Sequence, residues 1–223
     1  MSANRDTPFT PDVTGILLAG GQSRRMGQDK RWVTLEGIPL FHRTLTALIA
    51  VFTRIIVVVA RRDAMPDSEL PAGVEIVQDL IPNCGSAGGL YTGLACSPTP
   101  RAFVVACDMP FLNPDLVRHL CAFDPNADVL MVNMAGKVHP MHALYSKQCV
   151  PVLAAMLEEK QFKIQNLCTR EDLAVRILLG DEIKPWDPQG LSFLNINTPM
   201  DLEFAEKLLR NRSGLPSRKS DSE

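Results

Sequence analysis

The stretch VTGILLAGGQSRRMGQDK, residues 13–30, joins an apolar run to a loop of glycines and cations. The apolar run, 13–19, predicts a strand buried on both faces, as in a parallel sheet. The loop 20–30 contains three glycines and three cations. Backbone N–H groups and cations at the carboxyl end of a strand form a phosphate site by ordinary electrostatics. The stretch therefore predicts an α/β fold with an anion site after its first strand.

Outward from this stretch, short branched apolar runs alternate with segments of helical period. This alternation is typical of a mostly parallel sheet with helices packed on it. Further strands are predicted at 55–60, 74–78, 102–107, 128–133 and 138–145, with weaker candidates at 173–179 and 191–196. Helices are predicted at 39–52, 89–96, 113–121, 147–159 and 199–210. The predicted fold class is a single-domain, Rossmann-like, three-layer α/β/α architecture.

Two of these helices carry start signals. Asn113, Pro114 and Asp115 supply a cap, a proline in the first turn and a favourable negative charge. The last helix is preceded by Thr198 and has Asp201 three residues later, which is a capping-box pattern. Both helices are therefore expected to begin at these residues.

The domain is expected to span residues 13–211, between a flexible N-terminal arm at 1–12 and a disordered polar tail at 212–223. The net charge of −2 gives no general attraction to nucleic acid or anionic lipid, so neither partner is expected. No apolar run approaches the ~18 residues that span a bilayer. The polar start lacks the apolar core of a secretory signal, which predicts a cytoplasmic protein.

Cysteine and histidine carry no recognisable metal motif. The six cysteines include no Cys-x-x-Cys pair, so we expect them to be small, mostly buried apolar residues. His139 and His142 are separated by Pro140, which argues against a helical pair of ligands.

The glycine loop does not match the best-known nucleotide codes. A Walker loop has four residues between its glycines and then Lys-Ser/Thr, whereas five residues separate Gly21 from Gly27 and Gln28 follows. Gly-x-Gly-x-x-Gly is also absent, which disfavours a Rossmann oxidoreductase. From composition alone, a solvated basic turn remains an alternative.

The pattern LAGGxSxRMGxDK at 18–30 resembles the signature of the nucleotidyltransferases that attach a nucleotide to the molybdenum cofactor. Four further blocks stand in the expected order: CDMP at 107–110, Asp79 with GSAGG at 85–89, HPxxALY at 139–145, and NINTPxDL at 195–202. The Pro and Leu of the family's Gly-Pro-Leu-Ala-Gly loop are missing here. The resemblance covers about residues 14–207. Within the family, Leu-Ala-Gly-Gly with Asp-Lys is closer to the guanylyltransferase branch, the MobA type.

This resemblance implies a nucleotidyltransferase fold and an enzyme that transfers GMP from GTP to the phosphate of molybdopterin. The products would be molybdopterin guanine dinucleotide and pyrophosphate. It also implies Mg²⁺ as cofactor and transient contacts with cofactor-delivery enzymes or molybdoenzymes. The attacking phosphate is already anionic near neutral pH, so no general base is required.

The resemblance also implies the site. Asp108 is the expected Mg²⁺ ligand, because Mg²⁺ takes one or two carboxylates and this residue follows a predicted buried strand. Arg25 and Lys30 complete the catalytic set by holding the triphosphate and the leaving pyrophosphate. The residues implied to bind GTP are Leu18, Ala19, Gly20, Gly21, Lys30, Asp79, Gly88 and Asp108.

Three side chains have a second interpretation. Asp79 would accept from the two adjacent donors of guanine through its two oxygens, or else serve as a loop acid. Asn195 and Asn197 would support the metal or the pterin phosphate, or else help to cap the last helix. The asparagine that the family often carries after its second strand is missing from 57–61.

Two other functions stay open from the sequence. One is a cytidylyltransferase or sugar-phosphate nucleotidyltransferase of the same fold. The other is a non-catalytic adaptor that binds a nucleotide, although such an adaptor would have no chemical reason to retain Asp29, Lys30 and Asp108.

Overall fold

The computed structural model describes residues 12–20, 30–61 and 70–213. Its main sheet has eight strands in the order β5-β4-β1-β6-β9-β7-β10, with β8 paired to β7. The strands are β1 Val13–Leu18, β4 Ile55–Val59, β5 Val74–Gln78, β6 Arg101–Ala106, β7 Val129–Met134, β8 Lys137–Val138, β9 His142–Ser146 and β10 Val175–Leu179. A separate small sheet pairs β2 (Thr34–Leu35) with β3 (Ile38–Pro39).

The sheet is mostly parallel, as the sequence predicts. β1 runs parallel to both β4 and β6, β4 to β5, and β7 to β10, whereas β9 is antiparallel to β6 and β7. Every residue of β1 is buried, which is expected for a strand covered on both faces. Leu18 pairs with Val58 on one side and Ala106 on the other, so the loops after these strands begin side by side.

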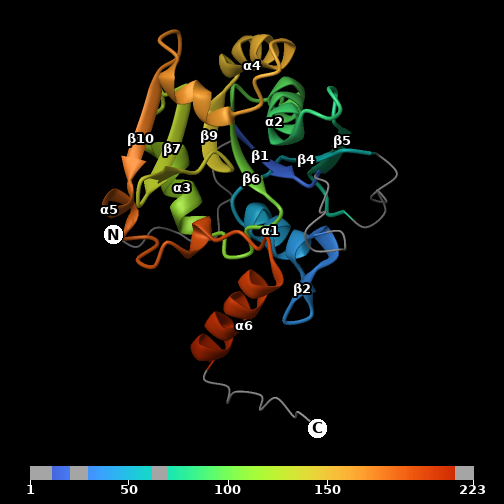
Figure 1. The fold of residues 1–223 in the computed structure, drawn as a ribbon, viewed down its shortest axis with the longest axis vertical. Coiled ribbons are helices and arrows are strands. Elements are labelled where there is room, and N and C mark those ends of the chain that lie inside the picture. Colours follow the sequence, from blue (N-terminus) through green and yellow to red (C-terminus); the bar gives the residue numbers. More distant parts are fainter. Residues whose placement is uncertain (1–11, 21–29, 62–69, 214–223) are drawn as a thin grey trace.

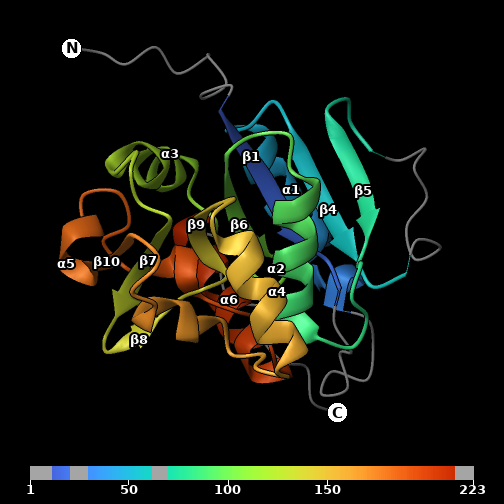
Figure 2. The same ribbon diagram turned by 90° about the horizontal axis from the view of Figure 1, so that it is seen from above.

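Helices cover both faces of the sheet and make the predicted three layers (Figures 1 and 2). One face carries α1 (Leu40–Ile49), α3 (Pro114–Phe123) and the short α5 (Gly180–Ile183). The other carries α2 (Gly85–Cys96), α4 (Cys149–Glu158) and the 3₁₀ segment η4 (Ile164–Thr169). Two apolar cores result: Leu17 packs into the first, and its neighbours Ile16 and Leu18 pack into the second.

The last helix, α6 (Pro199–Ser213), lies apart from the main sheet beside β2 (Figure 1). A third, smaller apolar cluster joins Ala205 of this helix to Leu35 and to Ile196. Two 3₁₀ segments complete the description, η1 (Lys30–Trp32) and η5 (Leu191–Phe193). No helix in the described part of the chain is long and apolar enough to cross a bilayer.

Two predicted elements differ from the structure. The prediction of a strand at 191–196 is wrong, because the chain turns through η5 and the Ile196 N–H then donates to the Asp108 carbonyl at 2.8 Å. The predicted strand at 138–145 is interrupted between β8 and β9. Helix α2 begins at Gly85 rather than at 89, because its glycine-rich first turn is stabilised by packing on the sheet rather than by helix propensity.

The prediction that the cysteines are mostly buried is also wrong. All six are free thiols, but only Cys121 and Cys149 are buried and Cys96 is exposed. Residues 1–11 and 214–223 lie outside the described residues, so the flexible arm and the disordered tail stay predictions.

Candidate active site

The candidate site lies where the order of the strands reverses. The chain moves outward from β1 to β4 and β5, then returns to the other side of β1 as β6. Open α/β sheets bind ligands beyond the carboxyl ends of their strands at such a reversal. Gly20 follows β1 and Asp108 follows β6, and the Cys107 N–H donates to the Leu18 carbonyl at 3.1 Å. The two loops are therefore held together from their first residues.

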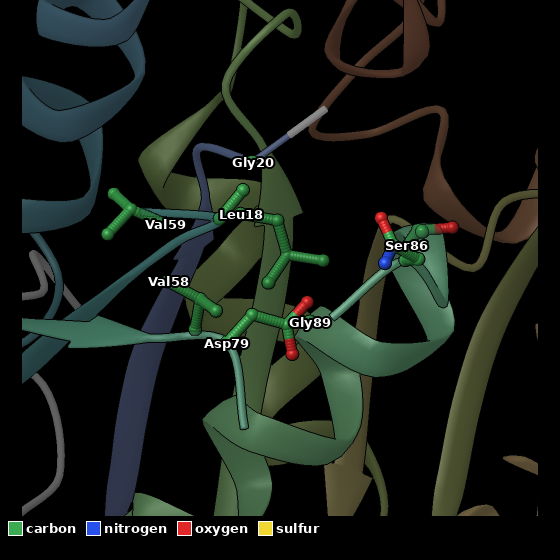
Figure 3. A pocket seen from close by; sticks show the side chains of 10 residues that line it. Leu18, Gly20, Val58, Val59, Asp79, Ser86 and Gly89 are labelled. Atoms are coloured by element: carbon green, nitrogen blue, oxygen red, sulfur yellow. The ribbon is translucent and has the colours of Figure 1, made fainter. Parts of the chain in front are cut away.

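A cavity of about 460 Å³ opens beyond β1, β4 and β5, within the size range of small-molecule sites (Figure 3). Its lining residues are Leu18, Gly20, Val58, Val59, Ala60, Asp79, Asn83, Gly85, Ser86 and Gly89. Apolar strand ends form one wall. Figure 3 shows the Asp79 carboxylate directed toward the start of α2, which forms the opposite wall.

Asp79 is held by both neighbouring strands and by α2. Its N–H donates to the Val59 carbonyl at 2.8 Å, which continues the pairing of β4 with β5. Its Oδ1 accepts from the Thr92 hydroxyl at 2.8 Å and from the Ile81 N–H at 3.2 Å. The sequence-based interpretation had both carboxylate oxygens facing a base. In the structure Oδ1 accepts hydrogen bonds from within the protein, and among the described residues none reaches Oδ2.

The glycines at the start of α2 have different surroundings. Gly89 lines the cavity, and a Cβ there would make ordinary contact with Leu18. Gly88, predicted to bind GTP, packs beneath the loop that precedes the helix. A Cβ on it would lie 2.9 Å from both the Ile81 carbonyl oxygen and the Cys84 Cβ. Because Gly88 has no side chain, the loop 79–84 can pack closely against the start of α2. The contact of Gly88 with GTP stays a prediction.

Sequence reasoning missed several residues of this cavity. Asn83 has a φ of +66°, a left-handed conformation in which asparagine is enriched. An asparagine in this glycine-bearing loop was therefore the one feature of the sequence that could have indicated such a turn. Ser86 lines the cavity in the place where the family motif has proline. Val58–Ala60 form an apolar wall where the family often has asparagine.

Asp108 follows β6 and is half-buried. The Asn195 side-chain amide donates to its Oδ1 at 3.0 Å, across 87 residues of sequence. The next residue along the loop is fixed by the Thr44 hydroxyl of α1, which donates to the Met109 carbonyl at 3.2 Å. The structure thus places Asn195 against Asp108, while its predicted support of the metal or the pterin phosphate stays a prediction.

The loop that carries Asn195 and Asn197 is anchored by the start of α6. The Asp201 Oδ2 accepts from the N–H groups of Asn197 at 2.9 Å and Thr198 at 2.8 Å. In return, the Thr198 hydroxyl accepts from the Asp201 N–H at 3.2 Å. This confirms the predicted capping box, which also positions the backbone of Asn197.

A second cavity, of about 200 Å³, lies on the other side of β6. Its lining residues are Met109, Lys137, Val138, His139, Pro140, Met141, Gln165, Asn195 and Asn197. Burial lowers the pKa of His139, and the nearby Lys137 charge lowers it further, which favours the neutral imidazole. Because β6 stands between the strands of the first cavity and β9, Asp108 lies between the two cavities.

The chemistry of this pair of side chains fits a hard divalent cation. Asp108 supplies a carboxylate oxygen, the ligand that Mg²⁺ prefers, and Asn195 donates an N–H of its side-chain amide to that carboxylate. Among the described residues, no group of three or more His, Cys, Asp or Glu side chains could hold a metal ion. A metal at Asp108 would therefore complete its shell with phosphate oxygens and water, which is usual for Mg²⁺ at nucleotides.

Three predicted site residues cannot be placed here. Gly21 and Arg25 lie outside the described residues, and Lys30 is described only as the first backbone position of η1. Their roles stay predictions.

Comparison with known proteins agrees with the fold and with the motifs. Residues 15–172 match the family model "MobA-like NTP transferase domain". The chain is 33% identical to a probable molybdenum cofactor guanylyltransferase of Chloroflexus aggregans, over 88% of this chain and 95% of that protein. It is 32% identical to the molybdenum cofactor guanylyltransferase of Vibrio cholerae, over 86% and 90% of the two chains.

A solved structure of similar fold is molybdopterin-guanine dinucleotide biosynthesis protein A from Archaeoglobus fulgidus. The TM-score is 0.77 at 27% sequence identity, covering 89% of this chain and 99% of that one. The sequence match, the strand order and the placement of Asp108 and Asn195 lead to one conclusion: the chain belongs to the MobA-like NTP transferase family.

Proposed function

We propose that this enzyme transfers GMP from GTP to the phosphate of molybdopterin and releases pyrophosphate. The observation that carries the proposal is the Asp108–Asn195 pair, which lies between two cavities at the switch point of the sheet. Family membership and the names of the relatives support the same reaction.

In this proposal the larger cavity takes the guanosine and the smaller one takes the acceptor. Asp79, with Oδ2 available, faces the base, and Gly20 after β1 lies beside the phosphates. Lys137, Asn195 and Asn197 line the acceptor cavity and offer a cation and amide donors to its phosphate. The two reactants then meet at Asp108.

The chemical step needs orientation and charge neutralisation rather than a covalent intermediate. An acceptor phosphate oxygen forms the new bond to the α-phosphorus of GTP, and the bond from that phosphorus to the bridging oxygen breaks, so that pyrophosphate leaves. Mg²⁺ held by Asp108 would neutralise phosphate oxygens at this point. Asn195 keeps the Asp108 carboxylate oriented, and Arg25 with Lys30 is predicted to hold the leaving group.

The base of the nucleoside triphosphate that the enzyme prefers, guanine or cytosine, separates this proposal from a cytidylyltransferase. Guanine presents a ring N–H and an adjacent amine, both donors, whereas cytosine has an acceptor at its ring nitrogen beside the amine. A carboxylate oxygen at Asp79 accepts hydrogen bonds only, so it suits guanine better. Turnover measured with all four nucleoside triphosphates decides between the two.

The decisive experiment is release of pyrophosphate from GTP in the presence of Mg²⁺ and molybdopterin, by wild type and by Asp108→Asn. We expect the variant to fold normally and to lose at least ~100-fold in turnover, the usual effect of removing one charged group that stabilises a transition state. Asp181→Asn, at an exposed position on α5, is the matched control and should keep wild-type turnover. Near wild-type turnover by Asp108→Asn at saturating Mg²⁺ would remove Asp108 from the mechanism.

Location in the cytoplasm, and transient contacts with proteins that deliver or receive the cofactor, stay predictions of the same proposal. So does Mg²⁺ as the particular divalent ion.

A further inference from the structure

Thr92 is a polar residue in the middle of α2 and is completely buried. Its hydroxyl donates to Asp79 Oδ1 at 2.8 Å and accepts from the Leu80 N–H at 3.0 Å. One side chain thus fixes both the carboxylate at the cavity and the backbone directly after it. None of the motifs in the sequence includes this residue.

The consequence is a carboxylate with two unequal oxygens. Oδ1 accepts from Thr92 and from the Ile81 N–H, which fills its two lone pairs. Among the described residues no hydrogen bond reaches Oδ2. That oxygen lies over Gly88, where a Cβ would come within 3.3 Å of it, so the absence of a side chain there leaves it room.

We propose that Thr92 is a positioning residue for base selection: it locks Asp79 so that Oδ2 alone is presented to the guanine edge. This inference rests on the proposed function, since it assumes that GTP is the nucleotide in this cavity. A single fixed anionic acceptor attracts the ring N–H and amine of guanine. The same oxygen repels the ring nitrogen of adenine at the equivalent place, because both are acceptors.

Removal of the Thr92 hydroxyl should leave the longer hydrogen bond from the Ile81 N–H as the remaining one to the carboxylate among the described residues, so that the carboxylate can turn more easily. It should also leave the Leu80 N–H without its Thr92 partner. Thr92→Val has nearly the same shape as threonine but cannot hydrogen-bond, whereas Thr92→Ser keeps the hydroxyl and loses only a methyl group. The dissociation constants of GTP and ATP are measured with Mg²⁺ and without molybdopterin. We expect Thr92→Val to weaken GTP about 10-fold with little change for ATP, and Thr92→Ser to retain most of the selectivity.

Thr14→Val is the matched control. Thr14 is equally buried, and its hydroxyl lies 2.6 Å from that of Thr99 at the opposite end of β1. This variant should lose stability, as Thr92→Val does, and keep the wild-type ratio of the two dissociation constants.

Three results would overturn the positioning role: equal weakening of GTP and ATP in Thr92→Val, failure of Thr92→Ser to restore selectivity, or a wild type without preference for GTP. Because binding is measured without acceptor, a wild type that selects GTP but releases no pyrophosphate contradicts only the proposed function. Loss of selectivity in Thr92→Val would still support the role of Thr92.

Discussion

Buried threonines hold the two ends of the sheet in place. Thr14 pairs with a second threonine at the amino end, Thr44 fixes the loop after β6, and Thr92 fixes Asp79. A hydroxyl both donates and accepts, so one small side chain can satisfy two backbone or carboxylate groups where water is excluded. Buried polar groups are costly unless they are paired in this way.

His142 departs from that rule. It is fully buried on β9, and neither ring nitrogen has a hydrogen-bond partner among the described residues. Its ring packs against Phe103 and Phe193, with centroids 5.1 Å and 4.4 Å away. Burial therefore lowers the pKa of His142 to about 3, and the residue is neutral in the folded protein at ordinary pH.

His142 should make the protein less stable in acid. The imidazole pKa is about 6.5 in an unfolded chain, so between roughly pH 6.5 and 3 the unfolded state binds the extra proton. The free energy of unfolding should consequently fall as the pH drops through this window, by about 1.4 kcal/mol per pH unit from this group. Urea unfolding of wild type and His142→Leu between pH 4 and 8 measures the difference.

The carboxylates titrate in both proteins, so their effect cancels in the difference between the two free energies of unfolding. That difference therefore reports the contribution of His142 alone. We expect His142→Leu to have a shallower pH dependence below about 6.5 and little difference above it. Parallel curves would mean that the imidazole is protonated, or solvated, in the folded state.

At the scale of elements, α2 sets the shape of the larger cavity through its contact with β1. The helix presents Gly89 and Gly93, four residues apart, to Leu18 and Ile16 on the strand. A Cβ at Gly93 would lie 2.7 Å from the Ile16 Cγ2, closer than real side-chain contacts allow. A Cβ at Gly89 would meet Leu18 at an ordinary 3.4 Å. The sheet therefore approaches the helix more closely at Gly93 than at Gly89.

Gly93→Ala should destabilise the protein although alanine is the better helix former. Alanine gains roughly 1 kcal/mol of helix propensity over glycine, whereas overpacking a closed contact costs typically 1–3 kcal/mol. Gly89→Ala, on the same face of the same helix, is the control for propensity and should be neutral or stabilising in a thermal melt. A Gly93→Ala variant as stable as the Gly89→Ala control would show that α2 can shift without cost.

The starts of α3 and α6 were predictable from the sequence. The Asn113 side chain accepts from the N–H groups of Asp115 and Leu116, and Thr198 with Asp201 forms its reciprocal cap. Both depend on residues within four positions of each other, so the pattern in the sequence contains the whole interaction. The segment 191–196 was mispredicted because its partner, the Asp108 carbonyl, lies more than 80 residues away.

At the scale of the whole molecule, the two cavities lie on different sides of β6 and share no lining residue. The cavity proposed for GTP, the nucleotide cavity, draws on β1, β4, β5 and α2. The cavity proposed for molybdopterin, the acceptor cavity, draws on the β8–β9 segment and the loop before α6. The nucleotide cavity is formed without any residue of the acceptor cavity. We therefore expect GTP to bind in the absence of molybdopterin.

GTP should stabilise the protein without acceptor. At 100 times its dissociation constant, a ligand that binds only the folded state adds about 2.7 kcal/mol to the free energy of unfolding. A melt with Mg²⁺ and GTP should show a higher Tm than one with Mg²⁺ alone, and ATP at the same concentration should have a smaller effect. If GTP raised the Tm only when molybdopterin was present, the two cavities would form one cooperative site.

The layered α/β architecture, the buried first strand, two helix caps and the candidates Asp79, Asp108 and Asn195 could all be predicted from the amino-acid sequence. These follow from apolar periodicity, local capping chemistry and motifs, all of which are read over short distances along the chain. Three features depend on the folded chain: Asn195 orients Asp108, Thr92 occupies one oxygen of Asp79, and neither ring nitrogen of His142 has a hydrogen-bond partner among the described residues. Each of these depends on residues from separate strands and helices meeting in space, and hydrogen bonds across such distances leave no spacing in the sequence from which to infer them.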